Sequence, residues 1–371
     1  MSDLTPVIDG HNDLPWALRT NGFYDFDKVD IATSQPQLQT DLARLRAGGV
    51  RGQFWSVFVP SEKVTDTPTT GDFFADTCEQ IDAVHRMVER YPDDLRLVTT
   101  ADQLDALLAS DSGPIASMMG AEGGHSIDDS LGALRTLHRL GVRYLTLTHN
   151  DNNNWADSAT DEPRHDGLSD FGKQVVAEMN RIGMMVDLSH VAPATMRDAL
   201  DVSTAPVIFS HSSAYAVNDH PRNVPDDVLA RLAGNDGICM ITFVTPFVSP
   251  AAWEWQQEFR AAAEAEGLDP RGRGPELEKF ADGYGSTMPR ATIDDVVAHC
   301  GHVREVAGID HIGIGGDFDG TSQLPEGLDD VAGYPRLTEA LAAKGWSNAD
   351  LAKLGSGNIA RVFRAVEQAA G

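Results

Sequence analysis

Short apolar runs alternate with amphipathic segments along the whole 371-residue chain, and this alternation limits the possible folds. Eight runs, rich in β-branched residues or methionine, are predicted strands: 7–11, 52–59, 115–122, 144–149, 184–190, 206–211, 238–244 and 311–317. Between these runs, apolar residues recur at helical spacing, which predicts helices over 41–47, 73–89, 131–140, 171–182, 226–233 and 293–307. Repeated strand and helix order requires crossover connections and a parallel sheet. Eight units favour a closed (β/α)8 TIM barrel over an open doubly wound sheet.

Most of the predicted strands end in a histidine or an acidic residue. These residues are His11 with Asp13, Glu122, His149, His190, His211 and Asp317. In a barrel, the carboxyl ends of the strands meet on one face, which carries the active site. Residues two apart in an extended segment point to the same side, so His11 and Asp13 can meet at one ion. Imidazole and carboxylate ligands suit zinc or a similar divalent ion, and the pattern predicts a metal site.

One segment departs from the alternation. Residues 246–290 contain Trp253, Trp255, a charged helical stretch and then several glycines and prolines. This length exceeds an ordinary connection. We therefore expect one catalytic domain over 1–371, with an insertion at 246–290 between the seventh and eighth predicted strands. The sequence leaves open whether this insertion is a lid, an oligomer contact or a peripheral helical excursion.

Charge and targeting signals limit the partners. The net charge of −27 argues against nucleic acid and anionic membrane surfaces, which bind clustered lysine and arginine. Cys78, Cys239 and Cys300 are widely spaced and odd in number, which is not a disulfide framework. No apolar stretch reaches the ~18 residues of a membrane span, and no secretion signal precedes the first predicted strand. These features predict a cytoplasmic protein.

Several motifs together resemble the membrane (renal) dipeptidase family. They are His-Asn-Asp-Leu-Pro at 11–15, Glu-Gly-Gly-His at 122–125, the runs 145–149 and 187–190, Ser-His-Ser-Ser-Ala at 210–214, His-Pro-Arg-Asn at 220–223, and Gly-Gly-Asp-Phe-Asp-Gly at 315–320. They follow the family order over essentially the whole chain. Two features differ from the family. The chain lacks the secretion signal and cysteine framework of the animal members, and 241–243 are Ile-Thr-Phe where an Asn-aromatic segment is common.

The resemblance implies an amidohydrolase barrel with two zinc ions. In that pattern His11 and Asp13 hold one ion, Glu122 bridges both ions, and His190 with His211 hold the other. Other divalent ions are compatible with the same ligands. The implied reaction is hydrolysis of dipeptides, L,D-dipeptides among them, by a hydroxide that bridges the metals. A homodimer is compatible with the resemblance, and the sequence leaves the oligomeric state open.

The resemblance also assigns residues to substrate and catalysis. His149 and Arg222 match substrate-contacting positions, and Asp317 matches the carboxylate beside the metal-bound water. The chemistry fits these roles, because Asp317 can carry the water's proton to the leaving amine and His149 can stabilise the developing oxyanion. The planar guanidinium of Arg222 suits a substrate's free carboxylate.

Other candidates and functions remain at this point. His125 is equally compatible with a role in orienting Glu122 and with a position at the start of a helix. Asp9 and Asp187 are expected to form hydrogen bonds rather than to bind a metal. Asp319 is expected to be structural, and a surface or packing role is expected of His299, Cys300 and His302. One competing function is an amidohydrolase that opens a cyclic amide or β-lactam, although no lysine ends a predicted strand to form a carboxylated bridge. Another is a non-catalytic metal-binding barrel.

Overall fold

The computed structural model describes residues 4–61, 71–110, 112–270 and 274–371. Within them, nine parallel strands form one sheet in the order β2-β1-β9-β8-β7-β6-β5-β4-β3. The strands are β1 (Val7–Asn12), β2 (Val50–Phe58), β3 (Leu95–Leu97), β4 (Ile115–Glu122), β5 (Val142–Thr146), β6 (Met185–Asp187), β7 (Val207–Ser212), β8 (Ile238–Ile241) and β9 (Ile312–Ile314). A further pairing of β2 with β4 closes eight strands into a barrel and leaves β3 outside it. The predicted (β/α)8 barrel is confirmed.

Four strands end three residues earlier than predicted. The sequence pattern continues β5, β6, β8 and β9 to His149, His190, Val244 and Asp317, whereas the ladders stop three residues before each of these positions. His190 and Asp317 adopt left-handed backbone conformations, with φ of 69° and 62°. Their side chains therefore project from turns above the barrel rather than from the strands. The short β3 was missed because only three residues pair, and only with β4.

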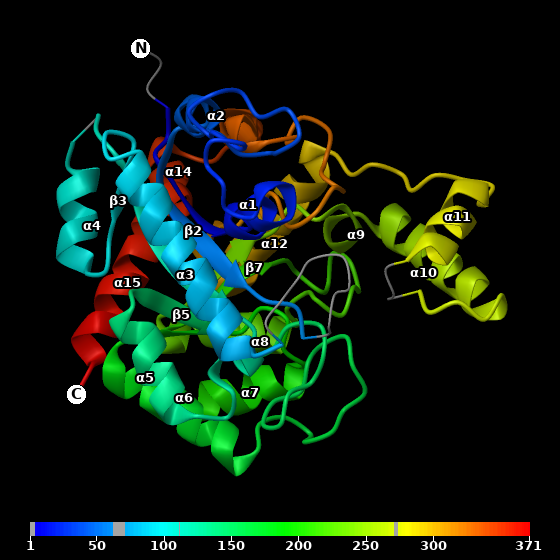
Figure 1. Cartoon of the computed structure of the whole chain (residues 1–371), viewed down its shortest axis with the longest axis horizontal. Helices are drawn as coiled ribbons and strands as arrows, with labels where there is room; N and C mark the ends of the chain where they lie inside the picture. The colour runs from blue at the N-terminus through cyan, green and yellow to red at the C-terminus, as the bar shows by residue number, and fades with distance from the viewer. Residues whose placement is uncertain (1–3, 62–70, 111, 271–273) are drawn as a thin grey trace.

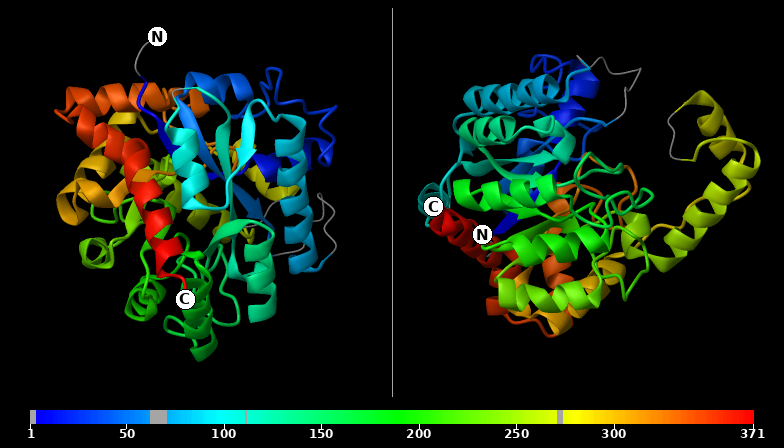
Figure 2. Two further views of the ribbon diagram at one scale, coloured as in Figure 1. Left: turned by 90° about the vertical axis from the view of Figure 1, so that its left-hand side faces the viewer. Right: turned by 90° about the horizontal axis from the view of Figure 1, so that it is seen from below.

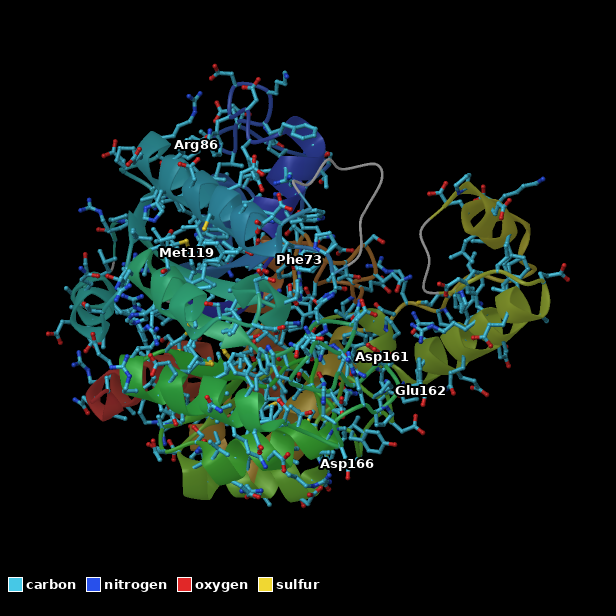
Figure 3. All side chains as sticks on the ribbon, turned by 60° about the horizontal axis from the view of Figure 1, so that its bottom comes forward. Phe73, Arg86, Met119, Asp161, Glu162 and Asp166 are labelled. Carbon is cyan, nitrogen blue, oxygen red and sulfur yellow. The ribbon has the colours of Figure 1, made fainter. Side chains whose placement is uncertain are left out.

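Helices surround the barrel, and the six predicted helical segments are confirmed as α2, α3, α5, α6, α8 and α12. The surrounding helices are α1 (Leu14–Gly22), α2 (Leu42–Ala47), α3 (Phe73–Arg90), α4 (Ala101–Leu108), α5 (Leu131–Arg139), α6 (Asp170–Ile182), α7 (Pro193–Val202), α8 (Asp226–Asn235), α12 (Ile293–Ala307), α13 (Tyr334–Ala343), α14 (Asn348–Ala352) and α15 (Asn358–Ala369). Several begin at a side-chain cap; Asp72, for example, accepts the Ala75 N–H at the start of α3. Figure 3 labels Phe73 at the start of α3 and Arg86 farther along the same helix.

The last helix closes the amino end of the barrel. Apolar side chains inside the barrel, among them Ile8, Phe54 and Met118, form one cluster with α15. The ring of Phe363 on α15 is buried and lies edge-on to Phe54, with centroids 6.4 Å apart. Helix α15 lies across one end of the barrel (Figures 1 and 2), and because the strands are parallel, their carboxyl ends meet at the opposite end.

An arm leaves the barrel between β8 and α12. It consists of α9 (Thr245–Val248), α10 (Pro250–Ala265) and α11 (Pro275–Gly283). Helices α10 and α11 project from the body in Figure 1 and in the right-hand view of Figure 2. Of the residues in α10, only Ala252 and Ala263 are buried, and α11 buries none of its nine. No helix within the described residues is both long and apolar enough to cross a membrane.

We predict that Phe363→Ala destabilises the fold by about 3–5 kcal/mol, because it leaves a cavity where α15 closes the barrel. Chemical denaturation measures this loss. Tyr215→Ala is the matched control, since Tyr215 is 44% exposed and its truncation should change the free energy of unfolding by less than about 0.5 kcal/mol. Equal effects of the two substitutions would contradict this account of the barrel floor.

Candidate active site

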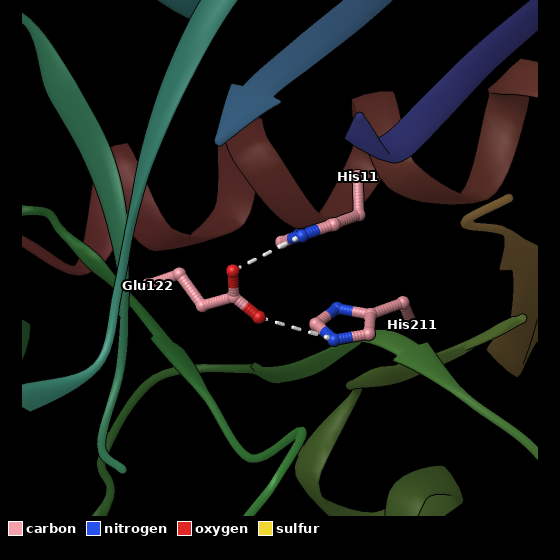
Figure 4. Close-up of side chains that lie close together, drawn as sticks. All are labelled: His11, Glu122 and His211. Atoms are coloured by element: carbon pink, nitrogen blue, oxygen red, sulfur yellow. Dashed lines mark ion pairs between the residues drawn. The ribbon is translucent and has the colours of Figure 1, made fainter. Parts of the chain in front are cut away.

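Glu122 lies between histidines from two other strands. His11 is on β1, Glu122 ends β4 and His211 is on β7, and all three are buried. His11 Nε2 lies 3.4 Å from Glu122 Oε2, and His211 Nε2 lies 3.4 Å from Glu122 Oε1 (Figure 4). Each carboxylate oxygen thus faces a different imidazole. This is the arrangement expected of a carboxylate shared by two ions.

Two further carboxylates gather around His11. Its Nε2 lies 3.3 Å from Asp13 Oδ2 and 4.0 Å from Asp317 Oδ1. Gly320 allows this approach, because a Cβ atom there would lie 2.2 Å from Asp13 Oδ2 and 2.5 Å from Asp317 Oδ1. The His-x-Asp alternation predicted that Asp13 lies in an extended segment with His11. The strand instead ends at Asn12, before Asp13. Asp13 is the residue that precedes α1, and its side chain still meets His11.

Two more histidines lie on the His211 side of Glu122. His190 Nε2 is 3.0 Å from Glu122 Oε1 and 3.0 Å from His211 Nε2. The ring of His149 lies 4.4 Å from the ring of His190. Burial lowers the pKa of His149 to about 4, so its imidazole is neutral near pH 7. The structure therefore brings together all seven of the predicted strand-end residues.

Hydrogen bonding fixes the proton on His11. The Tyr144 hydroxyl donates to the Gly10 carbonyl at 3.2 Å, so it accepts from His11 Nδ1–H at 2.9 Å. The Nε2 lone pair of a neutral His11 then faces Asp13, Glu122 and Asp317. This is how a partner group orients a metal-binding histidine.

A second chain of hydrogen bonds orients His211. Thr146 and Ser210 both donate hydroxyl hydrogens to Asp187 Oδ2 at 2.6 Å. Ser210 Oγ therefore accepts from His211 Nδ1–H at 2.8 Å, which leaves the Nε2 lone pair directed at Glu122. As expected, Asp187 acts through hydrogen bonds, and so does Asp9, which accepts from Gly316 N–H at 2.9 Å.

The donors fit divalent ions. His11 Nε2 and Asp13 Oδ1 are buried and have no hydrogen-bond partner within the described residues. Lone pairs and carboxylates that face one another at 3–4 Å repel unless a cation lies between them. Nitrogen and carboxylate oxygen are ligands that zinc and similar ions accept. Three groups of these side chains are close enough to hold an ion: His11 with Glu122 and His211; Glu122 with His149 and His190; and His11 with Asp13 and Asp317.

Arg222 is the buried cation beside this cluster. Only 2% of its surface is exposed, and its Nη2 donates to the His211 carbonyl at 3.3 Å. Burial lowers its pKa to about 10, while Asp317 and Glu122 act in the opposite direction. The guanidinium therefore stays charged at neutral pH.

Several residues outside the prediction support the site. Tyr144 orients His11, and Gly120 makes room for it, since a Cβ at Gly120 would lie 1.9 Å from the Tyr144 ring. Ser56 Oγ donates to Glu122 Oε2 at 3.2 Å. The sequence signal for Ser56 and Tyr144 was that each is a polar residue within an apolar run. Nothing in the sequence indicated which partner each would meet.

Four other candidates have structural contacts. His125 Nε2 lies 2.7 Å from the Val59 carbonyl oxygen. Asp319 accepts the Gln39 N–H at 2.7 Å, which ties its turn to the loop before α2. His299 Nδ1 accepts the Ala214 N–H at 3.0 Å, and Cys300 is buried in the core, as the packing interpretation expected.

Comparison with known proteins places this geometry in context. The profile of the family described as "Membrane dipeptidase (Peptidase family M19)" matches residues 1–371. The crystal structure of a probable dipeptidase from Pseudomonas aeruginosa is 24% identical, with a TM-score of 0.84 over 99% of this chain and 96% of that one. A metallopeptidase from Rhodobacter sphaeroides, liganded with a phosphinate mimic of L-Ala-D-Ala, is 24% identical with a TM-score of 0.78, over 98% of this chain and 100% of that one. Both structures share the fold.

We predict that Ser210→Ala weakens metal binding by roughly 10- to 100-fold, because His211 loses the partner that fixes its tautomer. Competition with a coloured chelator measures the affinity. Ser213→Ala is the matched control, since the buried Ser213 hydroxyl has no hydrogen-bond partner within the described residues. The orienting role of Ser210 would be wrong if both variants bound metal as tightly as the unmodified protein.

Proposed function

The chain belongs to the membrane dipeptidase family, a family of hydrolases acting on dipeptides, and we propose that it works with two zinc ions held around Glu122. The observation that supports this proposal is the position of the Glu122 carboxylate. His11 lies beside one of its oxygens, and His190 and His211 lie beside the other. Asp13 would complete the His11 side. When bound, the ions would lower the pKa of water held between them and polarise the peptide carbonyl.

Asp317 is the proposed proton carrier. Its Oδ1 lies 4.0 Å from His11 Nε2, beside the proposed metal ligands. Burial raises the pKa of Asp317 well above its usual value, and Asp13 and Glu122 act in the same direction. A carboxyl group with a raised pKa can accept the proton of the attacking water and return it to the leaving amine. The leaving amine of a peptide requires this protonation.

His149 and Arg222 are proposed to hold the substrate. A neutral His149 can donate a hydrogen bond to the carbonyl oxygen as that atom gains negative charge. The buried guanidinium of Arg222 can bind the C-terminal carboxylate of a dipeptide through two parallel hydrogen bonds. Such a clamp limits substrates to short peptides with a free C-terminus.

The proposed substrates include L,D-dipeptides. The ligand of the Rhodobacter metallopeptidase, a mimic of L-Ala-D-Ala, is the reason to include this class in a substrate screen. A cytoplasmic location and a homodimer stay predictions from the sequence.

The first test concerns Asp317. Asp317→Asn keeps the shape of the side chain but cannot accept a proton, so turnover of a dipeptide should fall by at least about 10²-fold with the metal content unchanged. Asp319→Asn is the control, because Asp319 lies two residues away and accepts the Gln39 N–H at 2.7 Å. Near-normal turnover of Asp317→Asn with full metal content would remove Asp317 from the mechanism.

The second test concerns Arg222 and the substrate carboxylate. The unmodified protein should cleave a dipeptide far better than the same dipeptide with an amidated C-terminus. Arg222→Met should lower kcat/KM for the free acid by roughly 10- to 150-fold, the range of a charge-assisted hydrogen bond, and leave the amide little changed. Equal efficiency of the unmodified protein on acid and amide would refute the clamp and favour the cyclic-amide alternative.

A further inference from the structure

The arm begins next to Arg222. Helix α9 follows β8 directly, and α10 leaves the body immediately after it (Figure 1). The guanidinium carbon of Arg222 lies 5.2 Å from the centre of the Phe247 ring on α9, within the range of a cation–π contact. Arg222 Nε is buried and has no hydrogen-bond partner within the described residues. Phe247 contacts the guanidinium group, while Nη1 and Nη2 donate long hydrogen bonds to Ser212 Oγ at 3.5 Å and to the His211 carbonyl at 3.3 Å.

Two asparagines fasten Phe247 to the loop that carries Arg222. Asn218 Nδ2 donates to the Pro246 carbonyl at 2.9 Å and to the Phe247 carbonyl at 3.0 Å. Asn223 Nδ2 donates to the same Phe247 carbonyl at 2.7 Å. Both asparagines are buried. The loop and α9 thus form one hydrogen-bonded unit, which holds the backbone of Phe247 against the loop that carries Arg222.

His220 connects this unit to the arm. Its Nδ1 accepts the Arg222 N–H at 3.1 Å. Its ring centre lies 4.3 Å from that of Phe247 and 4.3 Å from that of Trp253, in the first turn of α10. Phe247, His220 and Trp253 together form an aromatic wall. The wall runs from the guanidinium to the base of the arm.

A second aromatic group lies farther along the arm. Trp255 stacks on Phe259 at 5.2 Å and meets the edge of Tyr284 at 5.7 Å. These rings join α10 to the chain that follows α11. Trp253 and Trp255 are therefore two residues apart on one helix and belong to different clusters. This separation provides a matched pair for an experiment.

We propose that the aromatic wall positions the Arg222 guanidinium for the C-terminal carboxylate of the substrate, so that the base of the arm sets the preference for free-acid dipeptides. The inference rests on the proposed role of Arg222. Phe247, His220 and Trp253 act through Arg222 and are positioning residues.

The physical reason is the orientation that a two-point contact needs. A guanidinium makes two parallel hydrogen bonds to a carboxylate only when its plane faces the carboxylate correctly. A long side chain that is free to rotate loses conformational entropy when it binds, and a ring beside the guanidinium removes that freedom beforehand. Weakening the wall should therefore reduce carboxylate binding more than it reduces the chemical step.

Trp253→Leu and Phe247→Leu test this proposal, with Trp255→Leu as the control. Steady-state kinetics would be measured for one dipeptide and its C-terminal amide, after metal content and melting temperature have been checked. We expect kcat/KM for the free acid to fall roughly 3- to 30-fold in Phe247→Leu, the range of a cation–π contact, and by a smaller factor in Trp253→Leu, because Trp253 reaches Arg222 only through His220. The loss should lie mainly in KM, with the amide unchanged. Trp255→Leu should match the unmodified protein on both substrates.

The outcomes separate this proposal from the one it rests on. If the unmodified protein prefers the free acid and Arg222→Met abolishes that preference, the clamp stands. The positioning role is then overturned if both wall variants keep the full preference for the free acid, or if kcat/KM falls equally for the acid and the amide. Neither result would contradict the carboxylate clamp. If the unmodified protein treats acid and amide alike, the clamp is wrong and the positioning role is wrong with it.

Discussion

The placement of negative charge around His11 is the constraint on which the rest of the site depends. Asp13, Glu122 and Asp317 approach one buried imidazole nitrogen at 3.3, 3.4 and 4.0 Å. Carboxylates this close together repel strongly in a low-dielectric interior unless positive charge lies among them. His11 sits in a strand of a closed barrel, so the backbone cannot relax to separate them. The geometry therefore favours bound cations, and the hydrogen bonds behind the histidines keep their lone pairs directed inward.

The sequence predicted which residues would meet, because barrel topology brings every strand end to one face. Glu122 and His211 are 89 positions apart in the chain. Their positions at the ends of apolar runs were sufficient to predict that they meet. The exact ends of the strands could not be predicted. Asp187 accepts the N–H groups of Ser189 and Ser210, so side-chain hydrogen bonds replace the ladder before His190. An apolar run does not show where this replacement begins.

The orienting partners were harder to infer than the candidate ligands. Tyr144 meets His11 only because β5 and β4 pair so that Gly120 lies opposite Tyr144, and because the barrel then brings this ring to β1. That contact depends on strand register and on a missing side chain, neither of which a single sequence displays. The arm was expected as an unusual segment at 246–290. Its connection to Arg222 through His220 required the side-chain positions.

The central claim is that the Glu122 carboxylate lies between two metal ions. Anomalous diffraction from crystals of the zinc-loaded protein, collected on both sides of the zinc absorption edge, tests this directly. The account predicts two zinc peaks about 3.5–4 Å apart, one beside His11 and Asp13 and the other beside His190 and His211, with one Glu122 oxygen on each. A single peak in crystals of catalytically active protein, or two peaks that do not share Glu122, would contradict it.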